Sequence, residues 1–587
     1  MAADLLAKGG LRIAVEGCGH GTLHSIYASV AKACEAKAWP DVDLLIIGGD
    51  FQAVRNAFDL NCMSVPKKYR EIGDFHEYYS GHRKAPYLTL FIAGNHEASN
   101  HLSELYYGGW VAPNIYYMGA ANVVRLGPLR IAGLSGIWKG YNYNKPHHER
   151  LPYSYNDTKS AYHVREYDTR KLLQLRTQVD VGLSHDWPRG VEWMGDYKWL
   201  WKKKDLFEAD AKNGQLGSVA ARRALDRLRP SHWFSAHLHV KYPAIVDHRS
   251  SATNEASASA SNETSVGAPN EASAGASKEP EVEVGPQKNE DEIDLDMDDD
   301  VGVQQTESKP SGDNVSNTAA VQANADEIDL EVDDAETGPV APTAAKENSE
   351  EVPDDLIAQL PASFAPQPKP SKPATLPFPE EIKNETTKFL ALDKCLPRRD
   401  FLQVLEIEPI STQPAGATYQ RPLRLEYDKE WLAITRVFAQ GLVFGDPTAT
   451  VPPDQGDAHY RPLIEQEEAW VEENIVKPGK MTVPDDFALT APVYDAALGA
   501  NVDGQPLEYT NPHTKTFCEM LQIPIPFDAT PEERAERMAR GPREDEDGGG
   551  FRGGRGGGGG GGRGRGRGRG GRGGGHGRGR GKWRGRG

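Results

Sequence analysis

The sequence lacks the features that mark secreted and membrane-bound proteins. No stretch of its 587 residues is apolar for long enough to span a bilayer, and Met1–Gly10 has neither the basic start nor the apolar centre of a secretory signal. Cysteine is scarce, widely spaced and odd in number, which argues against a disulfide framework (Cys18, Cys34, Cys62, Cys395 and Cys518). We therefore expect a soluble protein of a reducing intracellular compartment, with no membrane partner.

Positive charge is also in short supply, but only in one part of the chain. Residues 278–355 hold 25 Asp and Glu against 4 Lys, a net charge of −21, so the remainder of the −18 chain sums to about +3. From Phe551 to the end there are 11 Arg and one Lys with no acid. The overall charge is therefore uninformative about partners.

A chain of this length is too long for a single hydrophobic core, so we expect more than one domain. Its composition divides it into four parts. Residues 11–247 alternate apolar runs with polar helical patterns and predict a layered α/β domain. Residues 250–375, rich first in Ser, Ala, Asn and Glu and then in acid, bury too little apolar surface to offset chain entropy. We expect them to be a disordered, solvated linker.

Apolar periodicity returns in residues 376–540 and predicts a second, smaller folded unit. One helical face in it is expected to carry Trp431, Leu432, Ile434 and Phe438. Residues 541–587 form an Arg/Gly-rich tail that cannot fold alone. Such tails bind RNA weakly, through phosphate contacts and guanidinium stacking.

Six short apolar runs in the first domain predict buried strands: Leu11–Glu16, Asp43–Ile47, Leu88–Ala93, Arg130–Leu134, Val179–Leu183 and His232–Ala236. Five of these runs lead directly into a Cys, His, Asp or Asn. The stretch Trp138–Tyr167 is rich in Tyr, Asn, His and Lys and poor in aliphatic residues. It predicts a long loop, which in a compact domain is usually functional or disordered.

The polar residues at these strand ends are metal-ligand types. Extended residues two apart share a face, so Cys18 with His20, and His237 with His239, can each reach one ion. The other strand ends carry Asp50 after two glycines, Asn95 with His96, and His185 with Asp186. Taken singly, each is more often a hydrogen-bonded histidine or an inert buried thiol. Donors at five strand ends together indicate a metal centre.

The donor set constrains the metal and its chemistry. Imidazoles, one carboxylate, one carboxamide and one thiolate suit Zn²⁺, Fe²⁺ or Mn²⁺ far better than Mg²⁺. Such an ion lowers the pKa of bound water and neutralises charge on a phosphoryl oxygen. The pattern therefore points to hydrolysis of a phosphate ester.

The donors lie in five ordered motifs: Gly17-Cys18-Gly19-His20, Gly49-Asp50, Gly94-Asn95-His96-Glu97, Ser184-His185-Asp186 and Ala236-His237-Leu238-His239. These resemble the motifs of the calcineurin-like metallophosphoesterases, which normally have Asp where this chain has Cys18. With Cys in that place, and with the runs Gly49–Asn56, Gly108–Tyr117 and Leu183–Pro188, the chain resembles the RNA lariat debranching enzymes. The similarity covers residues 11–247 and resumes at Leu423–Ile434.

The resemblance implies a β-sandwich flanked by helices. It implies one ion on Cys18, His20, Asp50 and His239, and a second on Asp50, Asn95, His185 and His237; occupancy of one or both sites stays open, because a thiolate alters the first. The implied reaction is hydrolysis of the 2',5'-phosphodiester at the branch point of intron lariats, giving linear RNA. Branched RNA is then the partner, and the nucleus is the expected location, with the cytoplasm as an additional one.

The same resemblance suggests roles for residues beside the ligands. Asp50 and His96 are the expected catalytic residues, with His96 protonating the departing 2'-oxygen. Glu97 and Asp186 either orient imidazoles or are simple loop carboxylates. Arg55, with Asn56, is expected to contact phosphate. The stretch Gly136–Tyr167 resembles the lariat-recognition loop, whose Tyr, Asn and His residues suit stacking and 2'-hydroxyl contacts.

Two other functions remain open at this point. The superfamily motifs alone allow a metallophosphoesterase for another phosphodiester or for a phosphoprotein. A non-catalytic RNA-binding scaffold that works through its Arg/Gly tail is the second, although lost ligands would be its sign and none is lost. The oligomeric state is not predicted.

Overall fold

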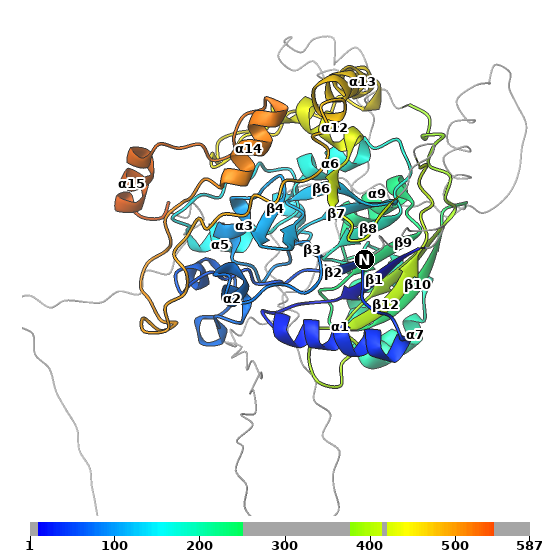
Figure 1. The fold of residues 1–587 in the computed structure, drawn as a ribbon, viewed down its shortest axis with the longest axis horizontal. Helices are drawn as coiled ribbons and strands as arrows, with labels where there is room; N and C mark the ends of the chain where they lie inside the picture. Colours follow the sequence, from blue (N-terminus) through cyan, green and yellow to red (C-terminus); the bar gives the residue numbers. More distant parts are fainter. Residues whose placement is uncertain (1–9, 250–375, 414–418, 545–587) are drawn as a thin grey trace, which may run out of the picture. The chain divides into compact units, whose positions relative to one another are not determined.

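The computed structural model describes residues 10–249, 376–413 and 419–544, and Figure 1 shows their arrangement. The predicted linker and the tail from residue 545 lie outside these residues, so their predicted disorder stays a prediction. The described residues up to Arg543 belong to one compact unit. In the part of the chain that is described, no helix is both long and apolar enough to cross a bilayer.

Two mixed sheets form the centre of this unit. The first has the order β12-β1-β2-β3-β5-β4, in which β1, β2, β3 and β5 run parallel. Its strands are β1 (Leu11–Glu16), β2 (Leu44–Ile47), β3 (Thr89–Phe91), β4 (Gly109–Ala112), β5 (Ile115–Tyr117) and β12 (Leu402–Ile407). The second has the order β10-β11-β9-β8-β7-β6-β13, with β7, β8, β9 and β11 parallel. Its strands are β6 (Ala121–Leu126), β7 (Leu129–Leu134), β8 (Val181–Ser184), β9 (His232–Ser235), β10 (Tyr242–Asp247), β11 (Thr386–Ala391) and β13 (Leu425–Tyr427).

Alternating residues of the first sheet enter two different cores. Ile13 and Val15 belong to a core shared with the second sheet, whereas Ala14 belongs to a core shared with α1 (Leu23–Lys37). Because side chains alternate between faces along a strand, one face of the first sheet meets the second sheet and the other is covered by helix. The predicted α/β sandwich with flanking helices is confirmed.

Helices cover the second sheet as well. The α6 helix (Glu166–Leu173) lies against β6 and α9 (Val219–Leu228), and α9 in turn lies against β8. The α12 helix (Lys429–Ala439) packs on α6 and on α13 (Asp457–Val471). The predicted apolar face of α12 is confirmed, since all four of its expected core residues are buried: Trp431, Leu432, Ile434 and Phe438.

The remaining elements are short. The helices are α2 (Phe75–Tyr79), α3 (Ser99–Ser103), α4 (Gly140–Tyr143), α5 (Tyr155–Ser160), α7 (Tyr197–Lys203), α8 (Phe207–Lys212), α14 (Pro512–Leu521) and α15 (Pro531–Arg540). Single turns of 3₁₀-helix occupy η1 (Asp59–Cys62), η2 (Lys67–Tyr69) and η3 (Val191–Met194), and the π-helical turn η5 (Glu472–Val476) continues α13.

Residues after 376 complete both sheets instead of forming a core of their own. β12 pairs with β1, β11 lies between β9 and β10, and β13 pairs with β6. A buried ion pair between Arg130 and Asp428, at 2.7 Å, joins the two parts of the chain. The two regions that the sequence suggests as separate folded units therefore share their sheets and their core.

Candidate metal centre

The predicted ligands lie at the carboxyl ends of parallel strands. They sit in the loops after β1, β2, β3, β8 and β9, which belong to both sheets. Since the carboxyl ends of parallel strands meet at one edge, the loops of each sheet converge there. The structure brings all seven predicted ligands into this region: Cys18, His20, Asp50, Asn95, His185, His237 and His239.

Four of these residues form one tight group. The ligand atoms of Cys18, His20, Asp50 and His239 all lie within 4.8 Å of one another. The Nε2 atoms of His20 and His239 are 3.3 Å apart, and Nε2 of His20 is 3.7 Å from Oδ2 of Asp50. This is the quartet that the family resemblance implies for one ion.

The second set surrounds His185. Its Nε2 lies 3.3 Å from Oδ1 of Asn95 and 3.4 Å from Oδ1 of Asp50, and its ring is 5.0 Å from that of His237 between centroids. Asp50 therefore turns one carboxylate oxygen toward His20 and the other toward His185. This geometry fits a carboxylate that bridges two cations.

The backbone at the cluster is held in a sparsely populated conformation. His20, Asp50, His237 and His239 have φ angles of 41°, 47°, 63° and 47°. For residues with a Cβ this left-handed region is uncommon, and it persists where the surroundings impose it, often at functional sites. The strand ends thus turn each ligand back toward the common centre.

Two glycines are required by the close packing of the ligands. A Cβ on Gly49, whose φ is 123°, would lie 2.1 Å from Nδ1 of His185. A Cβ on Gly94 would lie 2.1 Å from Oδ1 of Asp50. These glycines therefore make room for the ligand side chains.

The tautomer of His185 and the neutral state of two other histidines leave imidazole lone pairs available to a cation. Nδ1 of His185 lies 2.9 Å from the Gly48 carbonyl, which can only accept, so Nδ1 carries the proton and Nε2 offers its lone pair to the cluster. Burial lowers the pKa of both His20 and His237 to about 3, so both are neutral at pH 7.

The two anionic ligands differ in their electrostatic setting. Burial raises the pKa of Asp50, but the imidazoles of His185, His96 and His20 outweigh it and hold that pKa below its usual range. Burial and the nearby Asp50 raise the pKa of the Cys18 thiol. A cation favours the thiolate, so the set fits a divalent transition metal with affinity for sulfur and nitrogen.

The carboxylates of Glu97 and Asp186 act on the backbone. Glu97 accepts N–H bonds from Phe51, Gln52 and Gly94 at 2.8 to 2.9 Å, which fixes the loop that carries Asp50. Asp186 accepts the N–H of Trp138 at 3.2 Å. These bonds hold the ligand loops in place and agree with the second of the two predicted roles, that of loop carboxylates.

Arg55 has a role different from the predicted one. Its side chain is fully buried, and its guanidinium pairs with Asp59 at 2.9 Å and with Glu104 at 2.7 Å. Asn56 is also buried and donates to the Pro492 carbonyl at 2.7 Å. The expected phosphate contact is wrong for this geometry, because these groups brace the C-terminal region and do not face solvent.

Two lysines near the cluster were missed by the sequence reasoning. Lys394 lies beside Cys18 in a bridge between strand ends, and it adds to burial in lowering the pKa of His20 and of His239. Lys139 acts in the same way on His237. Lys394 carries no sequence signal, since it lies 376 residues from Cys18, whereas Lys139 lies in the predicted recognition loop.

The predicted recognition loop, Gly136–Tyr167, is more ordered than its composition suggests. It contains α4 and α5, and its Gly136 N–H bonds to the Ala93 carbonyl at 2.8 Å beside the third ligand loop. The loop is fastened by a buried ion pair between Arg165 and Glu149. It is therefore built into the rim of the cluster.

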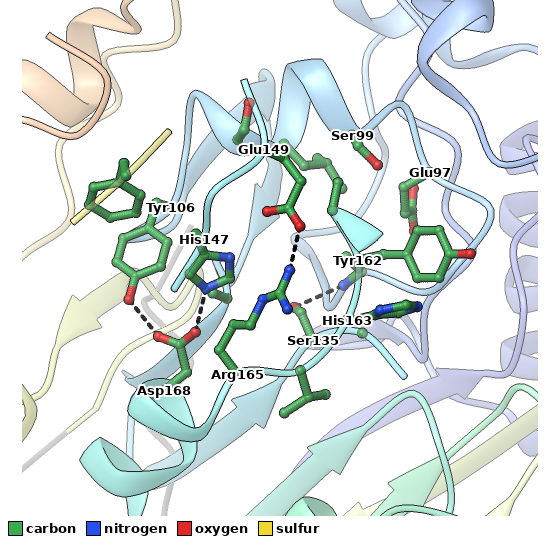
Figure 2. Close-up of a pocket in the computed structure, with 18 of the residues that line it drawn as sticks. Glu97, Ser99, Tyr106, Ser135, His147, Glu149, Tyr162, His163, Arg165 and Asp168 are labelled. Carbon is green, nitrogen blue, oxygen red and sulfur yellow. Dashed lines mark hydrogen bonds and ion pairs between the residues drawn. The ribbon is translucent and has the colours of Figure 1, made fainter. Parts of the chain in front are cut away.

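A pocket lies between this loop and the strand end that carries Glu97 (Figure 2). Its walls hold six aromatic side chains: Tyr106, Tyr117, Tyr153, Tyr162, Phe444 and Phe527. Two ion pairs lie in the pocket wall, as Figure 2 shows: Arg165 with Glu149 and His147 with Asp168. Glu97 also lines the pocket, and its carboxylate accepts backbone N–H groups. The wall therefore combines aromatic rings with charges that already have partners.

Comparisons with known proteins agree with this geometry. Residues 11–241 match the family model of the calcineurin-like phosphoesterases, and residues 384–526 match that of the lariat debranching enzyme C-terminal domain. The chain is 39% identical over 510 residues to the lariat debranching enzyme of Schizosaccharomyces pombe, covering 86% of this chain and 95% of that protein. It is 37% identical over 525 residues to the enzyme of Drosophila melanogaster (88% and 78%) and 35% identical over 514 residues to that of Homo sapiens (87% and 69%). The chain belongs to the lariat debranching enzyme family.

Proposed function

We propose that the protein is a metal-dependent phosphodiesterase that hydrolyses the 2',5' bond at the branch point of lariat RNA. Water is added across the bond, leaving a 2'-hydroxyl and a 5'-phosphate. The observation that carries the proposal is the convergence of Cys18, His20, Asp50 and His239 within 4.8 Å. The family membership supports the same reaction, and the intact donor set argues against a non-catalytic scaffold.

We infer two cation positions that share Asp50. Cys18, His20 and His239 complete the first position, and the second uses Asn95, His185 and His237. A divalent ion there supplies acidified water and charge neutralisation at the phosphate. We propose Fe²⁺, Zn²⁺ or Mn²⁺, since thiolate and imidazole favour these over Mg²⁺. Metal analysis of the purified protein, paired with reconstitution by each ion, identifies which one supports turnover.

His96 is the proposed proton donor to the departing 2'-oxygen. It is half-buried at the cluster, its backbone N–H bonds to Oδ1 of Asp50 at 2.9 Å, and its ring lies 5.5 Å from that of His20. A side chain so placed can face the substrate without serving as a ligand. His96→Ala should keep its metal and lose about 10²- to 10⁴-fold in turnover. Full turnover with full metal content would remove His96 from the mechanism.

Phosphate contacts are assigned to Lys139 and Lys394 in place of Arg55. Lys394 forms a bridge with Cys18, and Lys139 follows Trp138, whose N–H bonds to Asp186 beside the ligand His185. A cationic side chain in such a position attracts phosphate and offsets its repulsion by Asp50.

Selectivity for the branch is assigned to the recognition loop. Tyr141 and Tyr155 are 63% and 70% exposed, and exposed tyrosine rings are of the type that stacks on unpaired bases. Deleting the whole loop would also break the buried pair of Arg165, so Tyr141→Ala/Tyr155→Ala is the cleaner change. If the ratio of 2',5' to 3',5' cleavage stays the same in this variant, these two rings take no part in recognition.

One assay decides between the candidate functions. Metal-loaded protein is given branched RNA, linear RNA of matched sequence and a phosphopeptide. Cleavage confined to the 2',5' bond is expected. Equal rates on linear RNA or on the phosphopeptide would favour a broader phosphoesterase and overturn the proposal.

We also propose residence in the nucleus, where lariats are produced, and weak RNA contacts by the Arg/Gly tail. Both lie outside what the described residues address. Cell fractionation tests the first. Removal of residues 551–587, followed by measurement of the salt dependence of RNA binding, tests the second.

A further inference from the structure

A cluster of exposed aromatic rings lies on the segment Trp193–Lys204, outside the metal centre. Trp193 and Trp199 are 43% and 44% exposed, although large aromatic side chains are normally well buried. The ring centroids of Trp193 lie 5.4 Å from Tyr197 and 5.5 Å from Trp201. These distances are those of packed aromatic pairs, so Trp193, Tyr197 and Trp201 form a preformed surface, and Trp199 is exposed on the same helix as Tyr197 and Trp201, α7.

Lysines lie between these rings. Lys198, Lys202 and Lys203 are exposed, and Lys204 is half-buried. Asp196 is the one acid between Trp193 and Lys204, and its carboxylate accepts the Trp199 N–H at 3.1 Å as the cap of α7. The segment is therefore locally cationic in a chain of net charge −18. Aromatic faces beside lysines are the combination that binds single-stranded nucleic acid, through base stacking and phosphate contacts.

The surface is firmly attached to the elements that carry the metal ligands. Gly195 forms a bridge with Ala244 of β10, the strand that begins three residues after His239 (Figure 1). The Tyr242 hydroxyl donates to the Glu192 carbonyl at 2.7 Å, and its ring stacks on Trp187, two residues after His185. The same strand thus leaves the metal centre and supports the aromatic rings.

Two more lysines flank the cluster. Lys241 stands directly before β10, two residues after His239, and Lys394 forms a bridge with Cys18. A branch nucleotide carries three RNA chains, so when one phosphodiester occupies the metal centre the others must leave across the protein surface. A cationic surface with packed rings, supported by the strand that leaves the cluster, is suited to one of them.

We propose that Trp193, Trp199 and the lysines of α7 bind a single-stranded arm of the branched RNA. The inference rests on the proposed function for the identity of the substrate, but the surface itself is defined by its rings and charge. Recognition is by stacking and phosphate attraction, so it should tolerate any base sequence. The surface adds affinity for long-armed substrates beyond that of the branch itself.

The test compares a minimal branched RNA with three others in which one arm at a time is lengthened by ten uridines. For each RNA, the arm gain is its affinity divided by that of the minimal branched RNA. It is measured under non-cleaving conditions for the wild type and for Trp193→Ala/Trp199→Ala. A stacked base is worth roughly 5- to 150-fold in affinity. We expect one arm to give a gain in the wild type that falls at least about fivefold in the variant. Equal gains in both proteins would overturn the proposal.

Two further variants sharpen this result. Leu498→Ala removes an apolar side chain that is 65% exposed elsewhere, and it should leave the arm gain unchanged. Lys202→Ala/Lys203→Ala should reduce the salt slope of arm binding by about 1.4, at about 0.7 for each phosphate contact to a single strand. An acidic peptide that binds the wild type but not the tryptophan variant, with the arm gain intact, would make the surface a peptide site and overturn the RNA assignment.

The design separates this inference from the proposed function. Cleavage of the minimal branched RNA by the wild type reports on debranching. The arm gain is a ratio of two affinities of one protein, so a general loss of RNA affinity in a variant cancels out. Absence of cleavage with a tryptophan-dependent arm gain would contradict debranching and retain the surface. Cleavage with no arm gain in the wild type would support debranching and overturn the proposed RNA surface.

Discussion

The metal cluster and the recognition loop are neighbours, but their polar groups are organised in opposite ways. In the cluster, imidazole, carboxylate and thiol groups converge on one another, and the Nε2 atoms of His20 and His239 lie 3.3 Å apart. Around the loop, buried charges meet their opposites: Arg165 pairs with Glu149, and His147 pairs with Asp168 at 2.7 Å. The first arrangement is suited to a cation, whereas these ion pairs are complete without a ligand.

The difference separates charged side chains that contact a metal or substrate from those that stabilise the fold through ion pairs. Arg55 lies five residues after Asp50, but two carboxylates occupy its guanidinium, so it belongs with the loop pairs. A buried charge needs such partners, since the penalty for removing it from water is otherwise several kcal/mol. A functional charge must keep a face for the substrate. Position in the sequence beside a ligand does not decide between the two.

The largest expected effect comes from removing the shared ligand of the cluster. Asp50→Asn keeps the side-chain size but loses the anion that faces both cation positions. Changes outside the ligand shell typically cost 10- to 100-fold, so loss of this ligand should cost more than about 100-fold in turnover and metal content. Asp400→Asn, at an exposed site, is the matched control. A variant with normal metal content and turnover would break the distinction between the two regions.

Breaking a loop pair should affect stability first. Arg165→Met leaves Glu149 buried without its cation, which should lower the free energy of unfolding by about 3–5 kcal/mol in a denaturant titration. Arg83→Met, at an exposed pair with Glu77, should cost far less, because solvent screens this pair. If both substitutions cost the same, the loop pair is not the structural element that we describe.

Lys394 and Arg55 give a smaller and more selective contrast. Lys394→Ala should reduce the salt slope of RNA binding by about 0.7, as expected for one lost phosphate contact, with little change in stability. Arg55→Lys should destabilise the fold, because it loses the forked pairing with Asp59, and should leave that slope unchanged. A slope change for Arg55→Lys alone would reverse our assignment.

The smallest effect is a pH dependence carried by one loop carboxylate. Burial raises the pKa of Glu149, but Arg165 and the neighbouring histidines outweigh it and lower that pKa to about 2, against an ordinary 4.5. The folded state therefore resists protonation, and the stabilisation present above pH 4.5 is lost as the pH falls toward 2. Glu149→Gln should lack this component, which the difference between two unfolding titrations over that range would show. Parallel pH curves would contradict it.

Much of the fold follows from local patterns in the sequence. All six predicted strands are present, with ends within two residues of the expected positions. Four strands of residues 11–247 were not predicted: β4, β5, β6 and β10. Of these, β10 contains Pro243, which weakens a strand signal but is tolerated at the edge of a sheet. The joining of β11, β12 and β13 to the two sheets was also missed, because pairing partners hundreds of residues apart leave no local signal.

The site divides in the same way. Which residues stand at the strand ends could be read from the sequence, because apolar runs mark strands and the donors follow them directly. The role of Arg55 could not be read, because Glu104, 49 residues away, supplies part of its pairing. Lys394 was invisible for the same reason, since a long stretch of chain separates it from the ligands that it faces.

The sequence by itself determined the donors, their order along the chain and the strands that present them, because hydrophobic periodicity is local and acts within a few residues. The tertiary structure alone decided that the C-terminal strands complete both sheets, which charges are paired and which face the cluster. Those outcomes depend on contacts between distant segments, and such contacts exist only after the two sheets have packed together. The convergence of Cys18 with His239 is the clearest example, because 221 residues separate two atoms that belong to one site.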